Sequence, residues 1–463
     1  MDGQLFGWDF LNLRFVPMLR LLPEMWRWLM SPFSYMGNSD ILVWEGGMLR
    51  ILLRAHKNPF LAAGPYRSLG RNLIGGNVGN LVFSQAAYRL LSTRNTRIDT
   101  HKLVGLDPDW VNATYDQVVV PLANAFRPSF ADELRALTDL FSQLTIPVVV
   151  MGVGAQGPVT GHIGASPLDE TVKDFMSSVL NLSASVGVRG EVTAAYLKRL
   201  GFGEDVVDIT GCASVFMDGP NLRVVKRCEE LGPDSPISLN VSPYVAQMAP
   251  ICLEQAARYP NLIYTAQDHF TLSLMLTRIY DPRAPHPPGS PTSIDHPLFA
   301  QNRVRFCLDP STWMTYIKGF DFSFGTRIHG NIVALLSGVP AVVLAHDSRT
   351  LELADYHQIP RRVLPPKPED VDAAALYAET DWAPMMAGHA ERWDRMASFL
   401  VRNGLRHVFM PGESPDWFDQ KLAATRFPPP VEVGGTWLTR RETTVLNWVT
   451  ALRPPQEGQH SKA

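Results

Sequence analysis

The chain has 463 residues, of which 46% are hydrophobic and 19% are charged, so it can bury full cores and is not a disordered chain. A net charge of −3 argues against nucleic acid as the main partner, because a phosphate backbone requires a basic face, but it allows a local basic pocket for a small anion. The scattered cysteines form no CxxC pair and have no histidine at metal-ligand spacing, so we expect no metal site and a reducing cytoplasm. They are Cys212, Cys228, Cys252 and Cys307.

The first 39 residues are an arm rich in Trp, Phe, Leu and Met, in which Arg14, Arg20 and Arg27 are interspersed. Charges, Pro17 and Pro23 interrupt the apolar run, so it does not predict a membrane-spanning helix or a cleaved signal peptide. Two interpretations remain open. The arm either lies on a membrane surface as an interfacial helix or packs on the domain or a partner subunit, and the prolines favour packing.

An alternation of short apolar runs and amphipathic segments begins near residue 77. It predicts helices over residues 80–92, 130–144, 169–183 and 191–202, and strands over residues 116–122, 147–154, 185–190 and 206–211. After a linker at 231–236, strands are predicted over 237–244, 261–267, 303–309, 320–325 and 340–346. The proline-rich segment 282–297 predicts an exposed loop, and a helix over 390–404 is followed by a bend at 427–435 and one more helix.

This alternation predicts an α/β protein made of two Rossmann-like domains that face a cleft, with the carboxyl ends of the parallel strands pointing into it. We expect the N-terminal arm over residues 1–39, a first domain over 40–232 and a second over 233–380. A C-terminal helical extension and tail then covers 381–463.

The segment GVGAQG, from Gly152 through Gly154 and Gln156 to Gly157, matches a dinucleotide-binding fingerprint and follows a predicted strand. Pro158 and a loop come next instead of a helix, and no acidic residue closes a second strand, so the sequence argues against NAD. Exposed backbone N–H groups in such a loop still suit an anionic or sugar ligand.

Two further segments place cations beside the predicted cleft. Arg189 ends a short strand just before a helix, where a side chain of a parallel sheet points toward the ligand crevice, although a solvated ion pair is the usual fate of an arginine. In GTRIHGN, Arg327 and His329 lie near the first turn of a helix, which favours an anion, and Thr326 or Asn331 is expected to cap that helix.

Five segments, in this order and spacing, resemble the polysaccharide pyruvyl transferase family from about residue 75 to residue 360. They are GGNVGNLVFSQAAYRLL, VVVMGVGAQGP, VGVRGEVTAAYLKRLG, ITGCASVF and DFSFGTRIHGNIVALLSGVPAVVLAHDSR. The resemblance implies a GT-B-like fold and transfer of pyruvate from phosphoenolpyruvate to sugar hydroxyls. It places the arginine of the family's VxVR motif on Arg189, the histidine of GxRxH on His329, and a basic residue that is often lysine on Arg349.

The chain departs from the family pattern at two places. The NxGD motif is Asn77-Val-Gly-Asn80, so no carboxylate role is carried over to residue 80, and PLANAFRP replaces a glycine-rich segment. We therefore expect Asn77, Asn80 and the GVGAQG loop to line the cleft, with no role assigned to them in the chemistry.

The residue types fit this chemistry, because a donor with a phosphate and a carboxylate needs at least two cationic clamps. Arg189, Arg327 and Arg349 are the expected clamps, His329 the expected general acid and Asp347 a candidate base, although an Asp in a turn is equally often structural. No metal or cofactor is expected beyond the donor substrate. The expected partners are phosphoenolpyruvate and a glycan or lipid-linked sugar acceptor, and a homo-oligomer and peripheral membrane contact stay open.

Two other functions stay open from the sequence. The same architecture would serve a nucleotide-sugar-dependent glycosyltransferase, which UDP or GDP sugars would stabilise against heat. A non-catalytic glycan-binding relative would keep the fold without needing His329.

Overall fold

The computed structural model describes residues 47–157, 163–284, 287–365, 367 and 370–435. The expected N-terminal arm and the last expected helix lie outside these residues. Among the described helices, none is long and apolar enough to cross a bilayer.

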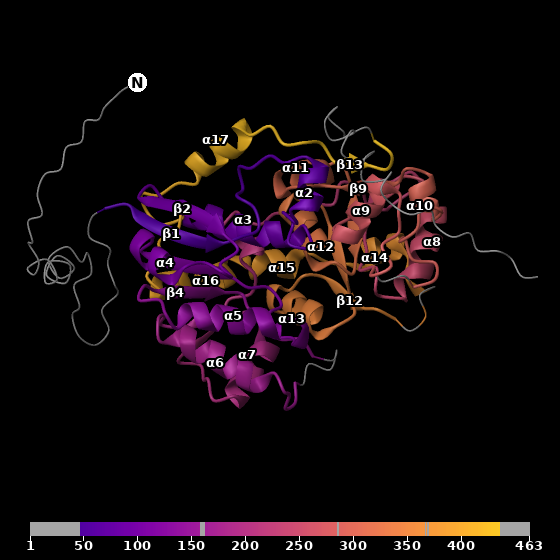
Figure 1. Cartoon of the computed structure of the whole chain (residues 1–463). Coiled ribbons are helices and arrows are strands. Elements are labelled where there is room, and N and C mark those ends of the chain that lie inside the picture. The colour runs from indigo at the N-terminus through magenta and orange to yellow at the C-terminus, as the bar shows by residue number, and fades with distance from the viewer. Residues whose placement is uncertain (1–46, 158–162, 285–286, 366, 368–369, 436–463) are drawn as a thin grey trace, which may run out of the picture. The chain divides into compact units, whose positions relative to one another are not determined.

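The first sheet has the strand order β2-β1-β3-β4 and is parallel throughout (Figure 1). Its strands are β1 (Leu49–Arg54), β2 (Thr96–His101), β3 (Gln117–Pro121) and β4 (Val148–Met151). Beyond β4, a parallel bridge between Val153 and Val188 leads to the pair β5 (Val186–Val188) and β6 (Val207–Ile209).

The strands β3, β4, β5 and β6 confirm the four strands predicted for this half. β1 lies before residue 77, where the predicted alternation begins, and β2 lies within the alternation but was not predicted. The apolar strands β3 and β4 are buried along their whole length. The edge strand β2 buries only Ile98, so its alternation is too weak to recognise from sequence.

The second sheet has the order β12-β11-β10-β7-β8-β9-β13, with only β13 antiparallel. Its strands are β7 (Ile237–Asn240), β8 (Leu262–Ala266), β9 (Val304–Phe306), β10 (Phe322–Gly325), β11 (Ala341–Ala345), β12 (Arg361–Val363) and β13 (Val431–Glu432). All five expected strands of this half are confirmed. The strand order reverses between β7 and β10, as in nucleotide-binding sheets, and ligands bind such sheets at that point.

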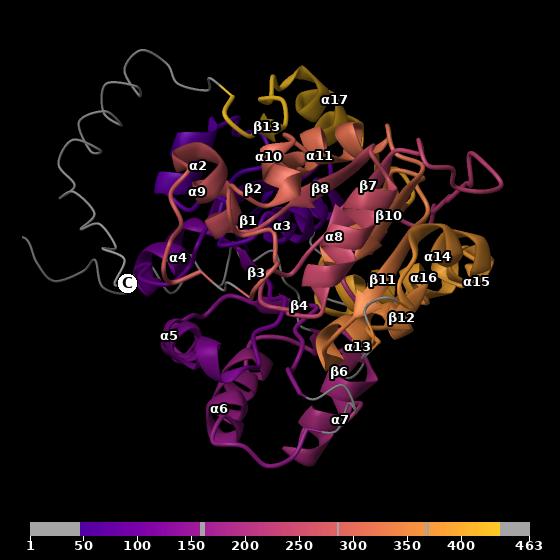
Figure 2. The same ribbon diagram turned by 90° about the vertical axis from the view of Figure 1, so that its right-hand side faces the viewer.

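Helices cover both sheets, and the expected α/β class is confirmed (Figures 1 and 2). Those of the first half are α2 (Pro65–Gly70), α3 (Gly79–Leu91), α4 (Pro108–Thr114), α5 (Ala131–Phe141), α6 (Asp169–Leu180) and α7 (Glu191–Arg199), with the 3-10 turns η1 (Pro128–Phe130) and η2 (Ala213–Phe216). The second half has α8 (Met248–Arg258), α9 (His269–Thr277), α10 (Pro297–Ala300), α11 (Pro310–Ile317), α12 (Ile328–Leu336), α13 (Ser348–His357), α14 (Ala373–Glu379) and α15 (Ala383–Ala387).

The amphipathic patterns explain why these helices form. In α5 the residues Leu134, Leu137 and Phe141 are buried on one face, while Asp132 and Glu133 occupy the first turn, where the helix dipole favours negative charge. The expected exposed loop at 282–297 has no regular element among its described residues before α10, which agrees with the prediction. Ser290 and His296 are buried in it, so it is exposed only in part.

The C-terminal segment returns to the first half through α16 (His389–Arg402), while α17 (Asp416–Ala424) leads on to β13 (Figure 1). Phe399 of α16 packs so closely on Gly187 of β5 that a Cβ there would lie 3.0 Å from its ring. Just beyond α16, the carbonyl of Asn403 accepts from Gln117 Nε2 (2.9 Å), and its Nδ2 donates to Ser185 Oγ (3.0 Å). Within the extension expected over residues 381–463, the described part up to residue 435 therefore contacts the first sheet and adds a strand to the second.

Phe399 gives a direct test of this packing. Phe399→Ala should lower the free energy of unfolding by about 3–5 kcal/mol, because the ring is only 2% exposed and its removal leaves a cavity. Arg395→Ala on the exposed face of the same helix should change it by less than about 0.5 kcal/mol. Urea denaturation measures both, and equal values for the two variants would contradict the packing described.

Candidate functional site

The GTRIHGN turn lies where the strand order of the second sheet reverses, and Asn240 at the end of β7 holds it. Gly325 has a φ of +139°, and a Cβ there would lie 1.8 Å from the Asn240 carbonyl oxygen, so no side chain fits. That carbonyl accepts from Thr326 N (3.0 Å), and Asn240 Oδ1 accepts from Arg327 N (2.9 Å). The backbone before α12 is thus fixed against β7.

The expectation that Thr326 or Asn331 caps α12 was wrong. Thr326 Oγ1 accepts from the Ser242 amide (2.8 Å), which joins the turn to the segment after β7. Asn331 donates to the Gly325 carbonyl (3.0 Å) and accepts from Asn240 (2.9 Å). Arg327 occupies the N-cap position and its side chain makes no capping bond. Both polar side chains thus hold the turn after β10 against β7 and the segment that follows it, and neither caps the helix.

Arg189 enters the site from the first half, at the end of β5. Its Nε donates to the Gly152 carbonyl (3.2 Å), and Gly154 leaves the room that it needs, since a Cβ there would lie 2.7 Å from Arg189 Cδ. The side chain is 3% exposed, and its Nη2 has no hydrogen-bond partner. Burial lowers the pKa of Arg189, against the opposing charges of Cys212 and Glu352. The GVGAQG loop therefore accommodates a buried guanidinium.

A cavity of about 470 Å³ brings residues of both halves together at the carboxyl ends of their strands. Most of the expected site residues line it: Asn77, Asn80, Gln156, Arg189, Thr326, Arg327, His329 and Arg349. Three expected residues are not in its lining. Gly152 and Gly154 instead contact Arg189 from behind, and Asp347 is used locally.

Asp347 is the N-cap of α13. Its Oδ1 accepts from Thr350 N (3.0 Å) and Thr350 Oγ1 (2.7 Å), and its Oδ2 accepts from Arg349 Nε (2.7 Å). Burial alone would raise the pKa of Asp347, but the Arg349 and His346 charges and these hydrogen bonds outweigh it and lower the pKa. Asp347 is thus an ionised carboxylate with both oxygens occupied, which makes it poorly suited to take up a proton.

The remaining cations surround the cavity. Arg327 Nε donates to the Val241 carbonyl (3.2 Å), and its guanidinium lies 5.7 Å from the centre of the Tyr244 ring. The Tyr244 hydroxyl accepts from Arg349 Nη2 (3.4 Å). A fourth arginine, Arg127, also lines the cavity, and burial followed by the charges of Arg349 and Arg189 lowers its pKa. The charges of these arginines act on one another, so a bound anion would be stabilised by several of them.

His329 faces this cluster from the first turn of α12. Burial, followed by the charges of Arg189 and Arg327, lowers the pKa of His329 to about 3, so the imidazole is neutral near pH 7. Its Nε2 lies 3.8 Å from Cys212 Sγ, whose other neighbour is Ser214 Oγ at 2.9 Å. Negative charge in the cavity would offset the two guanidinium groups and raise the pKa of His329, and the imidazole would then be protonated more easily.

Sequence reasoning missed several lining residues. Arg127 and Tyr244 lie in loops with no periodic pattern. Arg127 follows the predicted strand 116–122, whereas Tyr244 is the last residue of the predicted strand 237–244 and lies beyond the observed end of β7. Two other missed residues carry buried polar atoms without a hydrogen-bond partner among the described residues: Ser242 Oγ and Gln267 Nε2. A third missed residue, His346, has its Nε2 3.4 Å from Asp347 Oδ2. Buried polar groups are normally paired, so such a group of unpaired atoms around one cavity indicates a polar ligand.

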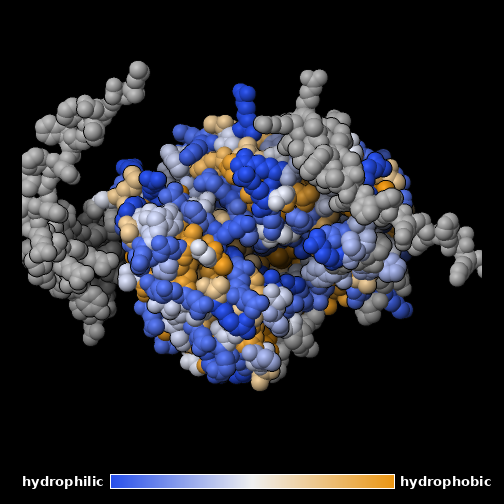
Figure 3. Space-filling model, viewed as in Figure 1, coloured by the Kyte–Doolittle hydropathy of each residue, from blue (hydrophilic) through white to orange (hydrophobic). Residues whose placement is uncertain are grey.

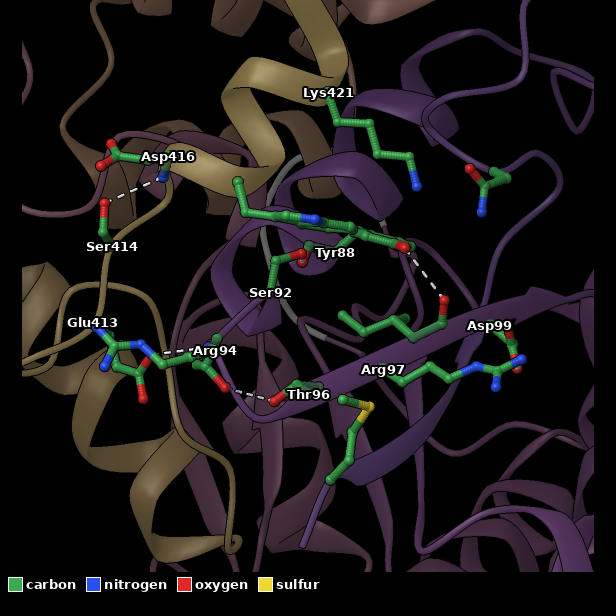
Figure 4. Close-up of a pocket in the computed structure, with 15 residues that line it drawn as sticks. Tyr88, Ser92, Arg94, Thr96, Arg97, Asp99, Glu413, Ser414, Asp416 and Lys421 are labelled. Atoms are coloured by element: carbon green, nitrogen blue, oxygen red, sulfur yellow. Dashed lines mark hydrogen bonds and ion pairs between the residues drawn. The ribbon is translucent and has the colours of Figure 1, made fainter.

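A larger cavity of about 610 Å³ lies elsewhere, between β2, the end of α3 and α17 (Figure 4). Figure 4 shows Lys421 extending from α17 and Arg97 on β2. Here the charges already have partners, since Arg97 lies 3.7 Å from Asp99 and Lys421 lies 4.8 Å from the centre of the Trp417 ring. None of the expected site residues lines this cavity, so its size does not make it the better candidate.

On the face drawn in Figure 3, hydrophilic residues predominate around scattered apolar ones.

The geometry gathers four arginines around one cavity between two parallel α/β halves. A family model for polysaccharide pyruvyl transferases matches residues 77–348, more than half of the chain. The chain belongs to the polysaccharide pyruvyl transferase family, and the protein is therefore a transferase. The family in general uses phosphoenolpyruvate as donor and a sugar as acceptor.

Comparison with solved structures finds remote likenesses. An uncharacterised protein of Klebsiella pneumoniae is 14% identical, with a TM-score of 0.37 and coverage of 73% of this chain and 95% of that one. UDP-N-acetylglucosamine 2-epimerase from Rickettsia bellii is 11% identical, with a TM-score of 0.41 over 76% and 96%. Anabaena HepE in complex with UDP and glucose is 12% identical, with a TM-score of 0.37 over 81% and 99%. No curated protein matches the chain.

The lowered pKa of His329 predicts a measurable pH dependence of stability. The unfolded chain protonates this histidine below its ordinary pKa of 6.5, whereas the folded chain does so only near 3, so stability is lost as pH falls through this window. As pH falls from about 6 to about 5, the free energy of unfolding should fall less steeply in His329→Gln than in the wild type. The difference between the two slopes should be about 1 kcal/mol per pH unit. Urea denaturation at several pH values measures this, and parallel pH profiles would contradict the assignment.

Proposed function

We propose that the protein moves a pyruvate unit from phosphoenolpyruvate to hydroxyls of a sugar in a cell-surface polysaccharide or its precursor, forming a ketal and releasing phosphate. The observation that carries this proposal is the group of four arginines around one cavity, in a chain whose net charge is −3. We place the reaction in the cytoplasm or at the membrane periphery, with a homo-oligomer and a lipid-linked acceptor among the expected arrangements.

The donor carries two anionic groups, and the site offers cations from both halves. Arg189 reaches the cavity from the first half, while Arg327 and Arg349 reach it from the second. Arginine binds phosphate and carboxylate through a planar pair of N–H groups, so these three residues are assigned to donor binding. The unpartnered Arg189 Nη2 supports the assignment because a bound anion would complete its hydrogen bonding.

The reaction requires a proton on C3 and an oxygen on C2 of the donor. The methylene C3 takes a proton and becomes a methyl group, C2 becomes oxocarbenium-like, and a sugar hydroxyl forms a C–O bond to C2 as it loses its proton. A second hydroxyl then displaces the phosphate at C2, so the C–O bond to phosphate breaks and inorganic phosphate leaves with the proton of that hydroxyl. The products are the ketal and phosphate.

His329 is the residue assigned to protonation of C3. It is neutral in the free protein because burial and two guanidinium groups oppose its charge. A bound trianionic or dianionic donor would offset those cations and raise the pKa of His329, so the acid would form together with the donor complex. Asp347, the candidate base from sequence, is not assigned that role here, since Thr350 and Arg349 occupy its oxygens.

The other expected residues are proposed to shape the cleft. Asn77, Asn80 and Gln156 line it with amide groups, and Thr326 fixes the turn that presents Arg327. Gly152 and Gly154 act indirectly, through the position of Arg189.

Donor binding is tested by thermal shift with phosphoenolpyruvate. The wild type should gain stability with the donor, and Arg189→Gln should need at least about 100-fold more donor for the same shift, because it loses a buried charged hydrogen-bond donor. Arg50→Gln, on an exposed arginine paired with Asp116, is the control and should respond as the wild type does. Stabilisation by UDP or GDP sugars and none by phosphoenolpyruvate would contradict the proposal and favour a nucleotide-sugar glycosyltransferase.

The role of His329 is tested by phosphate release with phosphoenolpyruvate and a broad glycan panel. The wild type should release phosphate only with a matching acceptor, and His329→Ala should lower kcat by at least about 1,000-fold while keeping the donor-induced thermal shift, because it removes the acid and not the clamps. Activity of His329→Ala close to that of the wild type would refute this role. Loss of folding would show instead that His329 is structural.

A further inference from the structure

A second cavity, of about 380 Å³, continues from the donor site into the first half. The two cavities share the lining residues Gly75, Asn80, Ala123, Asn124, Arg127 and Ser129. It lies past the carboxyl ends of β1 and β3, where the strand order of the first sheet reverses, and ligands of parallel sheets bind at such a point. Each half therefore has one cavity at its own reversal point, and the two are continuous.

The chemistry of the second cavity differs from that of the donor site. Its polar lining consists mainly of uncharged amides and hydroxyls, with two aromatic rings: Asn72, Asn80, Asn124, Ser84, Ser129, Phe83 and Phe130. The lining pair Arg54 and Glu133 form an ion pair with each other. The guanidinium of Arg127, which also lines the donor site, lies 5.2 Å from the centre of the Phe130 ring. Amides and hydroxyls match sugar hydroxyls, so this lining suits the hydroxyl groups of a carbohydrate.

His56, which follows β1, is the one histidine in the lining of this cavity. Its Nδ1 is buried and has no hydrogen-bond partner among the described residues. Burial, followed by the charges of Arg54 and Lys102, lowers the pKa of His56 to about 4, so its imidazole is neutral near pH 7. The other side chain of this lining that could accept a proton is the Glu133 carboxylate, which forms an ion pair with Arg54.

A short segment connects His56 to the donor site. Gly75, with a φ of +62°, packs on the His56 ring so closely that a Cβ would lie 2.4 Å from its Cδ2. Its carbonyl accepts from Asn80 Nδ2 (2.8 Å). At the other end of the segment, a Cβ on Gly79 would lie 2.9 Å from His329 Cβ. Residues 75–80 thus contact one imidazole in each cavity.

We propose that this second cavity binds the acceptor sugar and that His56 takes the proton of the attacking hydroxyl. The inference rests on the proposed pyruvyl transfer and adds the acceptor subsite and the base to it. The sugar O–H bond breaks as the oxygen bonds to C2 of the donor, the proton goes to His56, and His329 supplies the separate proton that C3 gains.

The first test is binding, followed by saturation-transfer NMR on the full chain with phosphoenolpyruvate and a panel of methyl glycosides of neutral hexoses and N-acetylhexosamines. At least one glycoside should show transfer with the wild type, and His56→Gln should weaken it several-fold. Absence of transfer for every glycoside in the panel overturns the acceptor subsite. If phosphoenolpyruvate still raises the melting temperature of the same sample, donor binding is intact and only the acceptor subsite is refuted.

The second test separates proton transfer from structural support, using phosphate release with the glycoside that binds. His56→Gln should lower kcat by at least about 100-fold and keep the donor-induced thermal shift, as loss of a general base predicts. His56→Ala should regain activity when free imidazole is added, which a purely structural role would not allow. His101→Gln, an exposed histidine at the end of β2 outside both cavities, is the matched control and should behave as the wild type.

Glu133→Gln tests the competing base on the same wall. It should change kcat by less than about tenfold, because Glu133 already pairs with Arg54. A large loss in Glu133→Gln combined with near wild-type activity in His56→Gln would overturn the assignment of His56. Failure of imidazole to restore any activity to a folded His56→Ala would overturn it as well.

Discussion

The site depends on one constraint, the burial of the Arg189 guanidinium without a full set of hydrogen-bond partners. A buried charge is costly unless it is paired, and here a single carbonyl bond from Gly152 leaves Nη2 unsatisfied. The surrounding structure is arranged to hold this group in place. Gly154 makes room for it, and the nearby Glu352 is fixed by Thr193, whose amide and hydroxyl both donate to its carboxylate. Such an arrangement favours a ligand that brings negative charge.

The two halves meet through α13 as well as through the cavity. Glu352 of α13 bonds to Thr193 at the start of α7, and burial raises the pKa of Glu352 to about 7. Ser348, one turn earlier, donates to the Gly157 carbonyl (2.8 Å) and accepts from the Gly157 amide (2.9 Å). These bonds join the second half to the glycine-rich loop and to Arg189, so the cations of both halves are held at one cavity.

Much of the fold was predictable from sequence, because buried parallel strands such as 148–151 and 341–345 are continuous apolar runs. The polar edge strand at 96–101 was not, since only Ile98 is buried. Arg189, Arg327 and His329 were recognisable because each follows a strand that ends at the cleft. The unpaired atoms of Ser242 and Gln267 depend on how distant segments pack around the cavity, which no local pattern encodes. The use of Asp347 as the N-cap of α13 is a local feature that the sequence interpretation did not assign to it.

The central claim is that cations from both halves hold one doubly anionic donor beside His329. The most direct measurement is a crystal structure of the full chain soaked with phosphoenolpyruvate. We predict that its phosphate and carboxylate bond to Arg189, Arg327 and Arg349, and that its C3 faces the His329 imidazole. Donor bound with C3 turned away from His329, or bound outside this cavity, would contradict the account.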